Sequence, residues 1–241
     1  MKGIILSGGN ATRLKPCTKV TSKQLLPVYN RPMIYYPLNT LIKAGIKEIL
    51  IIIAPERAGD YLNLLGSGKD FGVKFIYEIQ DKPRGLADAF IIGEKFIDED
   101  NVAMILGDNI FEDDLSAEIK SFKSGGKVFA KKVSDPERFG VVKFDANMKA
   151  VKIEEKPKVW LSDYALTGLY IFDNRVIEVA KNVKPSARGE IEITDVQSWY
   201  LEKGELEVAM VAGKWIDAGT FDSLLNAQNL AKEKLQDKLI I

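Results

Sequence analysis

The chain has 241 residues and no formal net charge, because 34 lysine and arginine residues balance 34 aspartate and glutamate residues. A balanced charge gives no reason to expect a nucleic acid as a partner. The sequence shows no secretory leader and no apolar run long enough to span a membrane. Its single cysteine, Cys17, cannot form an internal disulfide. We therefore expect a cytoplasmic protein of one large domain or two small ones, with no membrane partner.

The absence of histidine decides which chemistry is open to this chain. Ser-His-Asp and Cys-His catalysis are excluded. Histidine-ligated zinc is excluded too, and one cysteine cannot build a thiolate site. Any metal would rest on carboxylate oxygens, which makes Mg²⁺ the natural candidate. We expect Cys17 to serve as a small buried apolar residue.

Strand-like and helix-like segments alternate along the first half of the chain. The apolar run that begins at Gly3 predicts a buried strand, and 48–53 holds five Ile and Leu residues in succession, as buried strands do. Further strands are predicted at 73–78, 102–106 and 128–132, and helices at 33–44, 56–65, 85–96 and 115–123. This alternation predicts a parallel sheet covered by helices on both faces.

The pattern changes after residue 134. Segments 140–144 and 151–154 predict a hairpin. The remaining predictions are strands at 165–172 and 207–211, helices at 174–181 and 193–202, and a last helix within 221–239 that Thr220 caps. We interpret residues 1–241 as a single α/β domain, with a Rossmann-like mixed, mostly parallel sheet flanked by helices. Its parts are 1–133 and a smaller, β-rich 134–241.

A glycine loop, Gly8-Gly9-Asn10-Ala11-Thr12, follows the first strand. The N–H groups of such a loop form a concavity suited to anions. Arg13 adds a planar guanidinium for phosphate, and Lys15, Lys19 and Lys23 add charge nearby. The loop fits neither the Walker A pattern nor G-x-G-x-x-G. A nucleoside triphosphate site is one interpretation, and a tight turn with solvated lysines is the other.

Two aspartates stand where strands are predicted to end. Asp108 follows the buried strand 102–106, at the sheet edge that also carries the glycine loop. Asp217 lies between a short strand and a helix start. Each, taken alone, is most simply a turn or helix-cap residue. Together, two carboxylates that converge from distant parts of the sequence could hold one Mg²⁺ against a triphosphate.

The glycine loop resembles the signature G-G-x-G-T-R-L-x-P-x-T of the sugar-phosphate nucleotidyltransferase family. The continuation from Lys23 to Leu38 is similar to the glucose-1-phosphate thymidylyltransferase branch of that family. Matching blocks follow in order: Q-x-x-P-x-G-L-A from Gln80, L-G-D-N from Leu106, E-E-K-P from Glu154, T-G-L-Y from Thr167, G-E-I-E-I-T-D from Gly189 and W-x-D-x-G-T from Trp215. The resemblance therefore extends over nearly the whole chain.

The resemblance implies transfer of a thymidylyl group from dTTP to glucose 1-phosphate, giving dTDP-glucose and pyrophosphate. It implies Mg²⁺ as the cofactor, held by Asp108 and Asp217, with Arg13 and Lys23 as catalytic residues. The implied nucleotide-binding residues all lie in 1–133, the nucleotide-binding part, and are Leu6, Gly8, Gly9, Asn10, Ala11, Thr12, Gln24, Gln80, Gly85 and Asp108. The implied sugar-phosphate-binding residues, mostly in 134–241, are Leu86, Asn109, Gly140, Glu155, Lys156 and Tyr170.

Three departures from the family pattern leave alternatives open. Ala11 stands where the signature has its third glycine, and Phe139 replaces the more usual tyrosine before Gly140. The C-terminal helical segment of longer members, which helps form a regulatory nucleotide site, does not follow the last helix, so a homo-oligomer stays open as a partner. The alternatives are a UTP-dependent uridylyltransferase, a nucleotide-binding paralogue with reduced activity, and a glycosyltransferase.

Overall fold

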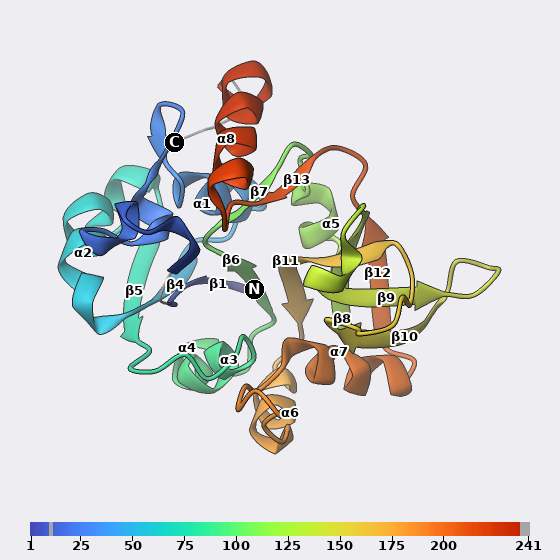
Figure 1. Cartoon of the computed structure of the whole chain (residues 1–241). Helices are drawn as coiled ribbons and strands as arrows, with labels where there is room; N and C mark the ends of the chain where they lie inside the picture. The colour runs from blue at the N-terminus through green and yellow to red at the C-terminus, as the bar shows by residue number, and fades with distance from the viewer. Residues whose placement is uncertain (10–11, 237–241) are drawn as a thin grey trace. The chain divides into compact units, whose positions relative to one another are not determined.

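The structure is a computed structural model, and it describes residues 1–9 and 12–236. The contacts of the chain group into two compact units, and each unit is assembled from segments that are not contiguous in the sequence (Figure 1). Unit 1 comprises Met1–Pro83, Ala103–Ser121 and Gly213–Ile241, and unit 2 comprises Arg84–Val102 and Phe122–Ala212.

The sheet of unit 1 places its strands in the order β6-β1-β4-β5. β1 pairs in parallel with β4, and β4 in parallel with β5. Every residue of β1 and β4 after the first is buried, because these apolar runs have neighbours on both faces. The strands are β1 (Lys2–Ser7), β4 (Glu48–Ile53), β5 (Lys74–Ile79) and β6 (Val102–Leu106).

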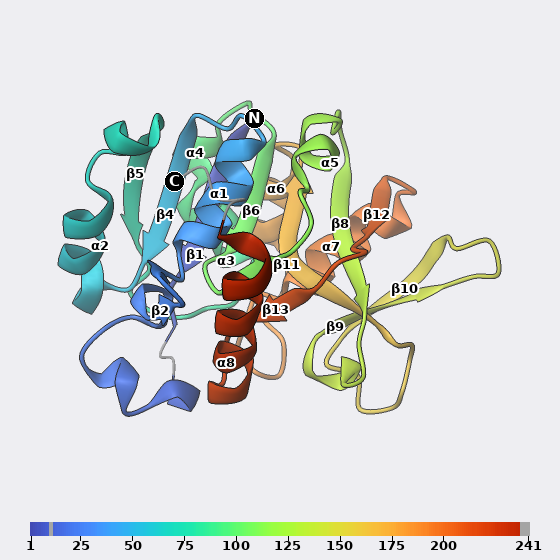
Figure 2. The ribbon, with the colours of Figure 1, turned by 90° about the horizontal axis from the view of Figure 1, so that it is seen from above.

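Helices and two small ladders complete unit 1. Helix α1 (Tyr35–Lys43) contacts β1, and α2 (Ala58–Leu65) lies toward the β5 edge of the sheet in both ribbon views (Figure 2). The antiparallel ladders are β2–β3 (Pro27–Val28 with Arg31–Pro32) and β7–β13 (Asn109–Phe111 with Trp215–Asp217). The other helical elements are η1 (Thr12–Leu14), η2 (Cys17–Lys19), η3 (Lys23–Leu25), η4 (Pro55–Arg57), η5 (Lys69–Phe71), α5 (Ser116–Lys120), α8 (Phe221–Leu230) and the π-helical η7 (Ala231–Leu235).

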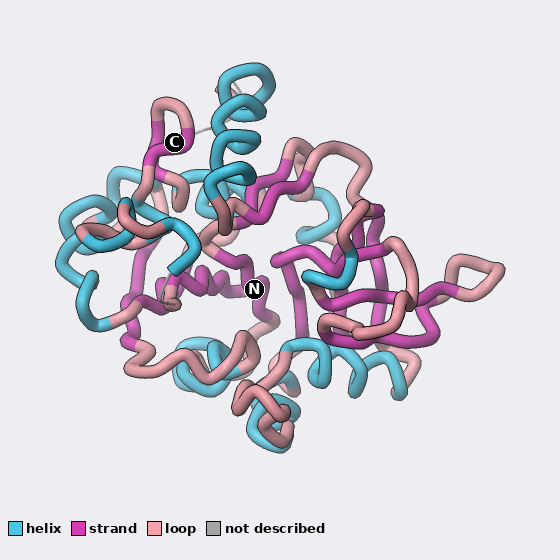
Figure 3. Tube along the Cα trace, in the orientation of Figure 1, coloured by secondary structure: helices cyan, strands magenta, loops and turns pink. Residues whose placement is uncertain are grey.

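Unit 2 is rich in antiparallel pairing. β11 pairs with β9 and β8, and β9 pairs with β10 in the hairpin seen in Figure 3, while β12 joins β8 in parallel. The strands are β8 (Gly126–Lys132), β9 (Gly140–Phe144), β10 (Ala150–Glu155), β11 (Tyr164–Phe172) and β12 (Leu206–Met210). The helical elements are α3 (Asp88–Ile92), α4 (Glu94–Ile97), η6 (Pro136–Arg138), α6 (Val176–Asn182) and α7 (Ile193–Glu202).

The predicted fold class is confirmed: the chain is an α/β protein with a mixed, mostly parallel sheet flanked by helices. Thr220 does cap α8, since its hydroxyl accepts the Ser223 N–H in a capping box. Among the described residues, no helix is long and apolar enough to cross a membrane.

Two local predictions are wrong. Residues 85–96 do not form one helix: α3 begins only at Asp88, because Gly85 has a φ of +105°, and Gly93 separates α3 from α4. Cys17 is exposed rather than buried, because it lies in η2, a short 3₁₀ turn in which no side chain is buried.

A buried carboxylate organises one end of unit 2. Asp173 accepts hydrogen bonds from the Gly125 N–H (2.7 Å), from Arg175 Nη2 (2.7 Å) and from the Tyr200 hydroxyl (2.9 Å). Burial alone would raise the pKa of Asp173, but these donors favour the carboxylate and lower the pKa below its usual value. The carboxylate therefore joins β11, α7 and the turn before β8.

Asp173→Asn should lower the free energy of unfolding by about 2 kcal/mol near neutral pH, a typical loss for hydrogen bonds to a charged group. Because the folded pKa is depressed, the contribution of the carboxylate is complete above the unfolded pKa of about 3.9 and is lost as the pH falls through the folded value. Urea unfolding of both proteins at several pH values measures this. A difference that stays constant into strong acid contradicts the assignment.

Candidate functional site

The carboxyl end of β1 leads into the glycine loop. A Cβ on Gly8 would lie 2.7 Å from Gln80 Oε1, so the Gln80 side chain rests against the backbone of the loop. Gln80 follows β5 and is buried, and Gly9 has a φ of +111°. Asn10 and Ala11 lie outside the described residues. The described part of the loop thus adjoins one of the two glutamines predicted to bind nucleotide.

A close backbone approach brings the end of β6 to the end of β1. The Gly107 N–H donates to the Leu6 carbonyl at 3.0 Å. A Cβ on Gly107 would lie 2.5 Å from Ser7 Oγ and 2.8 Å from Gln24 Cγ, so only glycine fits. Gln24 is itself buried and accepts the Tyr61 hydroxyl at 3.2 Å. This contact places Asp108, the next residue, beside the start of the glycine loop.

Lys23 and Asp108 form a buried ion pair. Lys23 Nζ donates to Asp108 Oδ2, and the two side chains are 14% and 12% exposed. Burial alone would lower the pKa of Lys23, but the charge and hydrogen bond of Asp108, with a further contribution from Asp217, raise it. Burial would likewise raise the pKa of Asp108, but Lys23 lowers it. Both groups therefore remain charged at neutral pH.

The β7–β13 ladder brings Asp217 to the same place. Asn109 is the register partner of Asp217, and the Ala218 N–H donates to the Asp108 carbonyl at 3.0 Å. A Cβ on Gly219 would lie 2.8 Å from Arg13 Nη2 and 2.9 Å from Asp217 Oδ1, so these two groups converge on one backbone position. Unit 1 thus gathers Arg13, Lys23, Asp108 and Asp217, which the sequence separates by more than half of its length.

Asn109 is buried, and its amide is engaged within unit 1. Its Oδ1 accepts the Trp215 indole N–H at 2.6 Å, and its Nδ2 donates to Asp108 Oδ1 at 3.0 Å. These bonds fix one oxygen of Asp108, and the predicted sugar contact of Asn109 is not tested by them. Trp215 is a residue that sequence reasoning missed, although it opens the W-x-D-x-G-T block.

The β9–β10 hairpin carries three of the predicted sugar-phosphate residues in unit 2. Gly140 is the register partner of Glu155, and a Cβ on Gly140 would lie 3.3 Å from Glu155 Oε2 and 2.7 Å from Thr194 Cγ2. Lys156 follows with a φ of +43°, its N–H bound to the Phe139 carbonyl and its Nζ 3.5 Å from Glu155 Oε1. Gly140, Glu155 and Lys156 are therefore neighbours, as the prediction requires.

Arg188 is a further residue that the sequence reasoning missed. Its Nη2 lies 3.3 Å from Glu155 Oε1 and 2.8 Å from Glu192 Oε2. Burial raises the pKa of Glu155, and the negative charge of Glu192 raises it further. The positive charges of Lys156 and Arg188 lower this pKa, but the net shift is upward. The sequence signal that could have identified Arg188 is its position directly before a block that contains two glutamates, Glu190 and Glu192.

Gly85 is fixed against the segment that precedes α7. The Ile191 N–H donates to the Arg84 carbonyl (2.7 Å), and the Ala87 N–H donates to the Ile191 carbonyl (3.3 Å). A Cβ on Gly85 would lie only 2.3 Å from the Ile191 oxygen. Leu86 is partly buried beside it. Gly85 and Leu86 thus belong to unit 2, with the predicted sugar-phosphate residues.

Tyr170 is almost wholly buried in the middle of β11, opposite Val128 of β8. Its exposed fraction of 4% leaves only the edge of the side chain to solvent. Leu6, at 7% exposed, is similarly enclosed at the end of β1. These two side chains therefore offer a substrate only a small accessible surface.

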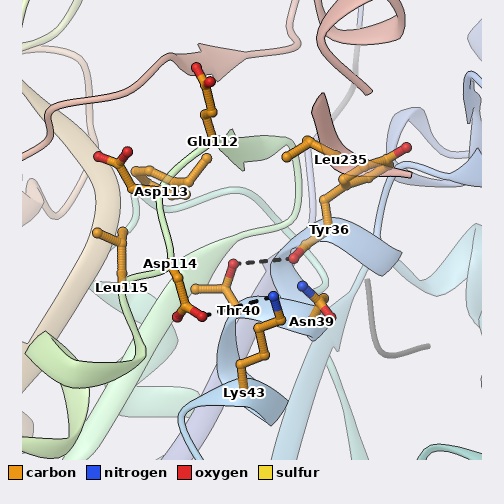
Figure 4. A pocket seen from close by; sticks show the side chains of 10 residues that line it. Tyr36, Asn39, Thr40, Lys43, Glu112, Asp113, Asp114, Leu115 and Leu235 are labelled. Carbon is orange, nitrogen blue, oxygen red and sulfur yellow. Dashed lines mark hydrogen bonds and ion pairs between the residues drawn. The ribbon is translucent and has the colours of Figure 1, made fainter. Parts of the chain in front are cut away.

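A cavity of about 240 Å³ in unit 1 lies apart from these residues. In Figure 4, Lys43 points toward Asp114, at 3.9 Å, and Thr40 Oγ1 donates to the Tyr36 carbonyl at 3.2 Å. None of the predicted site residues lines it. Within residues 1–9 and 12–236, no group of three or more Asp, Glu or Cys side chains is arranged to hold a metal ion.

Comparison with known proteins gives consistent matches over most of the chain. The nucleotidyl transferase family profile matches residues 2–234. A glucose-1-phosphate thymidylyltransferase of Neisseria meningitidis is 53% identical over 238 residues, covering 96% of this chain and 83% of the relative. One of Mycolicibacterium smegmatis is 52% identical over 237 residues, covering 96% and 82%.

Solved structures of similar fold include proteins of the same kind. A candidate glucose-1-phosphate thymidylyltransferase from Bacillus anthracis, crystallised with sucrose, is 49% identical with a TM-score of 0.92, and the match covers 97% of this chain and 96% of that one. A UDP-glucose pyrophosphorylase complexed with UDP-glucose has a TM-score of 0.84 at 24% identity, covering 97% and 98%. The second match shows a shared fold.

Gly85→Ala should lower the free energy of unfolding by about 1–3 kcal/mol, because the new methyl group would collide with the Ile191 backbone at a φ that alanine rarely adopts. Gly189→Ala is the matched control, since Gly189 also has a positive φ, of +75°, but no atom lies within 4 Å of its Cβ position. It should lose about 1 kcal/mol. Equal losses in urea unfolding contradict the packing argument.

Proposed function

The chain belongs to the nucleotidyl transferase family, and on that premise we propose that it transfers a thymidylyl group from dTTP to glucose 1-phosphate. The products are dTDP-glucose and pyrophosphate. Relatives about 50% identical over most of the chain carry this activity in their names. The observation that carries the proposal is the convergence of Arg13, Lys23, Asp108 and Asp217 in unit 1. Its two cations complement the charge of a triphosphate, and its two carboxylates complement the charge of a bound metal ion.

The chemistry needs no general base. The phosphate oxygen of glucose 1-phosphate is already anionic at neutral pH, and it forms the new bond to the α-phosphorus as pyrophosphate leaves. A site without histidine can therefore work by positioning and charge stabilisation. Arg13 and the glycine-loop N–H groups hold the triphosphate, and Lys23 stabilises the charge that develops at the α-phosphate. This assigns a specific task to each cation.

The two carboxylates fit a divalent cation. Asp108 accepts a hydrogen bond from the Lys23 ammonium, and the charge of Asp217 also acts on that ammonium, so a positive charge already lies beside Asp108. Oxygen ligands suit Mg²⁺, which completes its coordination with substrate phosphates and water. Asp108 and Asp217 would hold the ion, which when bound supplies neutralisation of phosphate charge.

Base recognition falls to two buried glutamines. Gln24 and Gln80 both adjoin the backbone at the ends of β1 and β6, and their amides offer donors and acceptors to a pyrimidine. In unit 2, Glu155 accepts sugar hydroxyls, Lys156 binds the sugar phosphate, and Gly140 contacts the sugar through its backbone. Gly85 and Leu86 supply backbone contacts. The partners are thus a nucleoside triphosphate and a sugar 1-phosphate, and the single cysteine supports a cytoplasmic location.

Three alternative functions would give different results in an assay of pyrophosphate release and nucleotide preference. A UTP-dependent uridylyltransferase would differ only in the base and ribose pockets. A nucleotide-binding paralogue would lack turnover, and the presence of all four charged residues argues against it. A glycosyltransferase would consume a nucleotide sugar and release no pyrophosphate.

Asp108→Asn and Asp217→Asn should each reduce kcat by about 10²–10³-fold, the usual effect of removing one charged group from a transition state. The reason is the loss of a carboxylate ligand for Mg²⁺. Pyrophosphate release measured at limiting Mg²⁺ reports the effect. Asp222→Asn, an exposed aspartate at the start of α8, is the control and should keep normal turnover. Near-normal rates in both site variants contradict the assignment.

In direct competition, dTTP should react faster than UTP by about 10–200-fold, because one buried methyl group is worth only that much discrimination. CTP should fall far below UTP, since cytosine reverses the donor and acceptor pattern that Gln24 and Gln80 read. Counting products from equimolar dTTP and UTP with glucose 1-phosphate measures the ratio. UTP preferred over dTTP would assign the chain to uridylyl transfer instead.

A further inference from the structure

The Lys23 ammonium lies where the proposed metal ion would bind. It donates to Asp108 Oδ2, and the charge of Asp217 acts on it as well. We propose that Lys23 is the resting counter-ion of this carboxylate pair, so that Mg²⁺ binds tightly only after a triphosphate has drawn the ammonium away. The inference rests on the proposed function, because it takes Asp108 and Asp217 as the metal ligands. It gives Lys23 a task before catalysis begins.

Asp108 turns its Oδ2 oxygen toward Lys23 and its Oδ1 oxygen toward Asn109. Its Oδ1 accepts the Asn109 amide at 3.0 Å, and its carbonyl accepts the Ala218 N–H at 3.0 Å. The residue is therefore held in place, and Oδ2 is the atom that faces Lys23. A divalent ion at Oδ2 would have to lie next to the ammonium or replace it. Repulsion between the two cations in a buried site makes replacement the favoured outcome.

Backbone hydrogen bonds hold the segment that carries Lys23, and the lysine side chain is its flexible part. The Leu26 N–H donates to the Lys23 carbonyl at 3.0 Å, and the Ile34 N–H donates to the Gln24 carbonyl at 2.8 Å. Lysine carries its charge on a flexible four-carbon stem with three rotatable donors. A triphosphate at the glycine loop supplies new oxygen acceptors for that ammonium. Rotation of the stem then exchanges Asp108 for phosphate without any backbone change.

The inference predicts an order of binding. In the nucleotide-free protein, Lys23 already neutralises part of the carboxylate charge, so free Mg²⁺ gains little by binding. When the triphosphate is present, its negative charge compensates both Lys23 and the metal. Metal and triphosphate therefore enhance each other's binding, because each is linked to the position of one lysine side chain.

Calorimetric titration of Mn²⁺ into the nucleotide-free protein tests this exchange. Lys23→Met removes the ammonium but keeps the length of the side chain, and it should bind Mn²⁺ about tenfold more tightly than the wild type or better. Lys15→Met removes an exposed lysine from the same segment and should match the wild type. Lys23→Met combined with Asp108→Asn should lose the gain. Equal Mn²⁺ affinity in wild type and Lys23→Met overturns the inference.

The wild-type protein gives a second test that does not depend on a variant folding. Mg²⁺ alone should leave its unfolding temperature nearly unchanged, whereas Mg²⁺ with a non-hydrolysable dTTP analogue should raise it beyond the analogue alone. Tight Mn²⁺ binding to the nucleotide-free wild type, abolished by Asp108→Asn, overturns the inference.

Mn²⁺ uptake separates the metal site from the counter-ion role of Lys23. If Asp108→Asn and Asp217→Asn leave Mn²⁺ uptake in the presence of the dTTP analogue unchanged, the proposed metal site itself is wrong. If both variants reduce that uptake while Lys23→Met gains no affinity without nucleotide, the metal site stands and only the counter-ion role of Lys23 is wrong.

Discussion

One backbone hydrogen bond, from the Gly107 N–H to the Leu6 carbonyl, sets the geometry of unit 1's candidate site. It closes the gap between the ends of β1 and β6, which carry the glycine loop and Asp108. The approach is too close for a side chain at Gly107. Asp108 follows this contact directly and accepts the hydrogen bond from Lys23. The sheet therefore acts as a rigid frame that fixes charges, as open α/β sheets do at the carboxyl ends of their strands.

The regular elements were predictable because their signals are local. Apolar runs such as 48–53 and 102–106 coincide with β4 and β6, and 193–202 coincides with α7. Thr220 was recognisable as a cap because its partner lies three residues away. The prediction failed at 85–96, where the apolar spacing is helical but Gly85 adopts a φ of +105° against Ile191. A contact more than a hundred residues away in the sequence overrides the local pattern there.

The sequence identified some residues of the candidate site and missed others, because some contacts join residues far apart in the chain. The resemblance supplied Asp108, Asp217 and Lys23, and the structure places these three in one cluster of unit 1. It gave no hint of Trp215 holding Asn109, or of Arg188 beside Glu155, because these contacts join residues 106 and 33 positions apart. The β7 strand was also missed, since three residues carry too little periodicity to be seen. Its pairing with β13 is what brings Asp217 to Asp108.

The interrupted make-up of unit 1 has a consequence for synthesis on the ribosome. Chain synthesis proceeds from the N-terminus, and domains fold as their parts emerge. Met1–Pro83 and Ala103–Ser121 emerge early, but the final segment of unit 1 begins only at Gly213. A nascent chain can therefore pair Lys23 with Asp108 long before Asp217 has been translated. A chain that ends before Trp215 holds every strand of the large sheet but cannot form the β7–β13 ladder. Such a fragment carries Asp108 without Asp217.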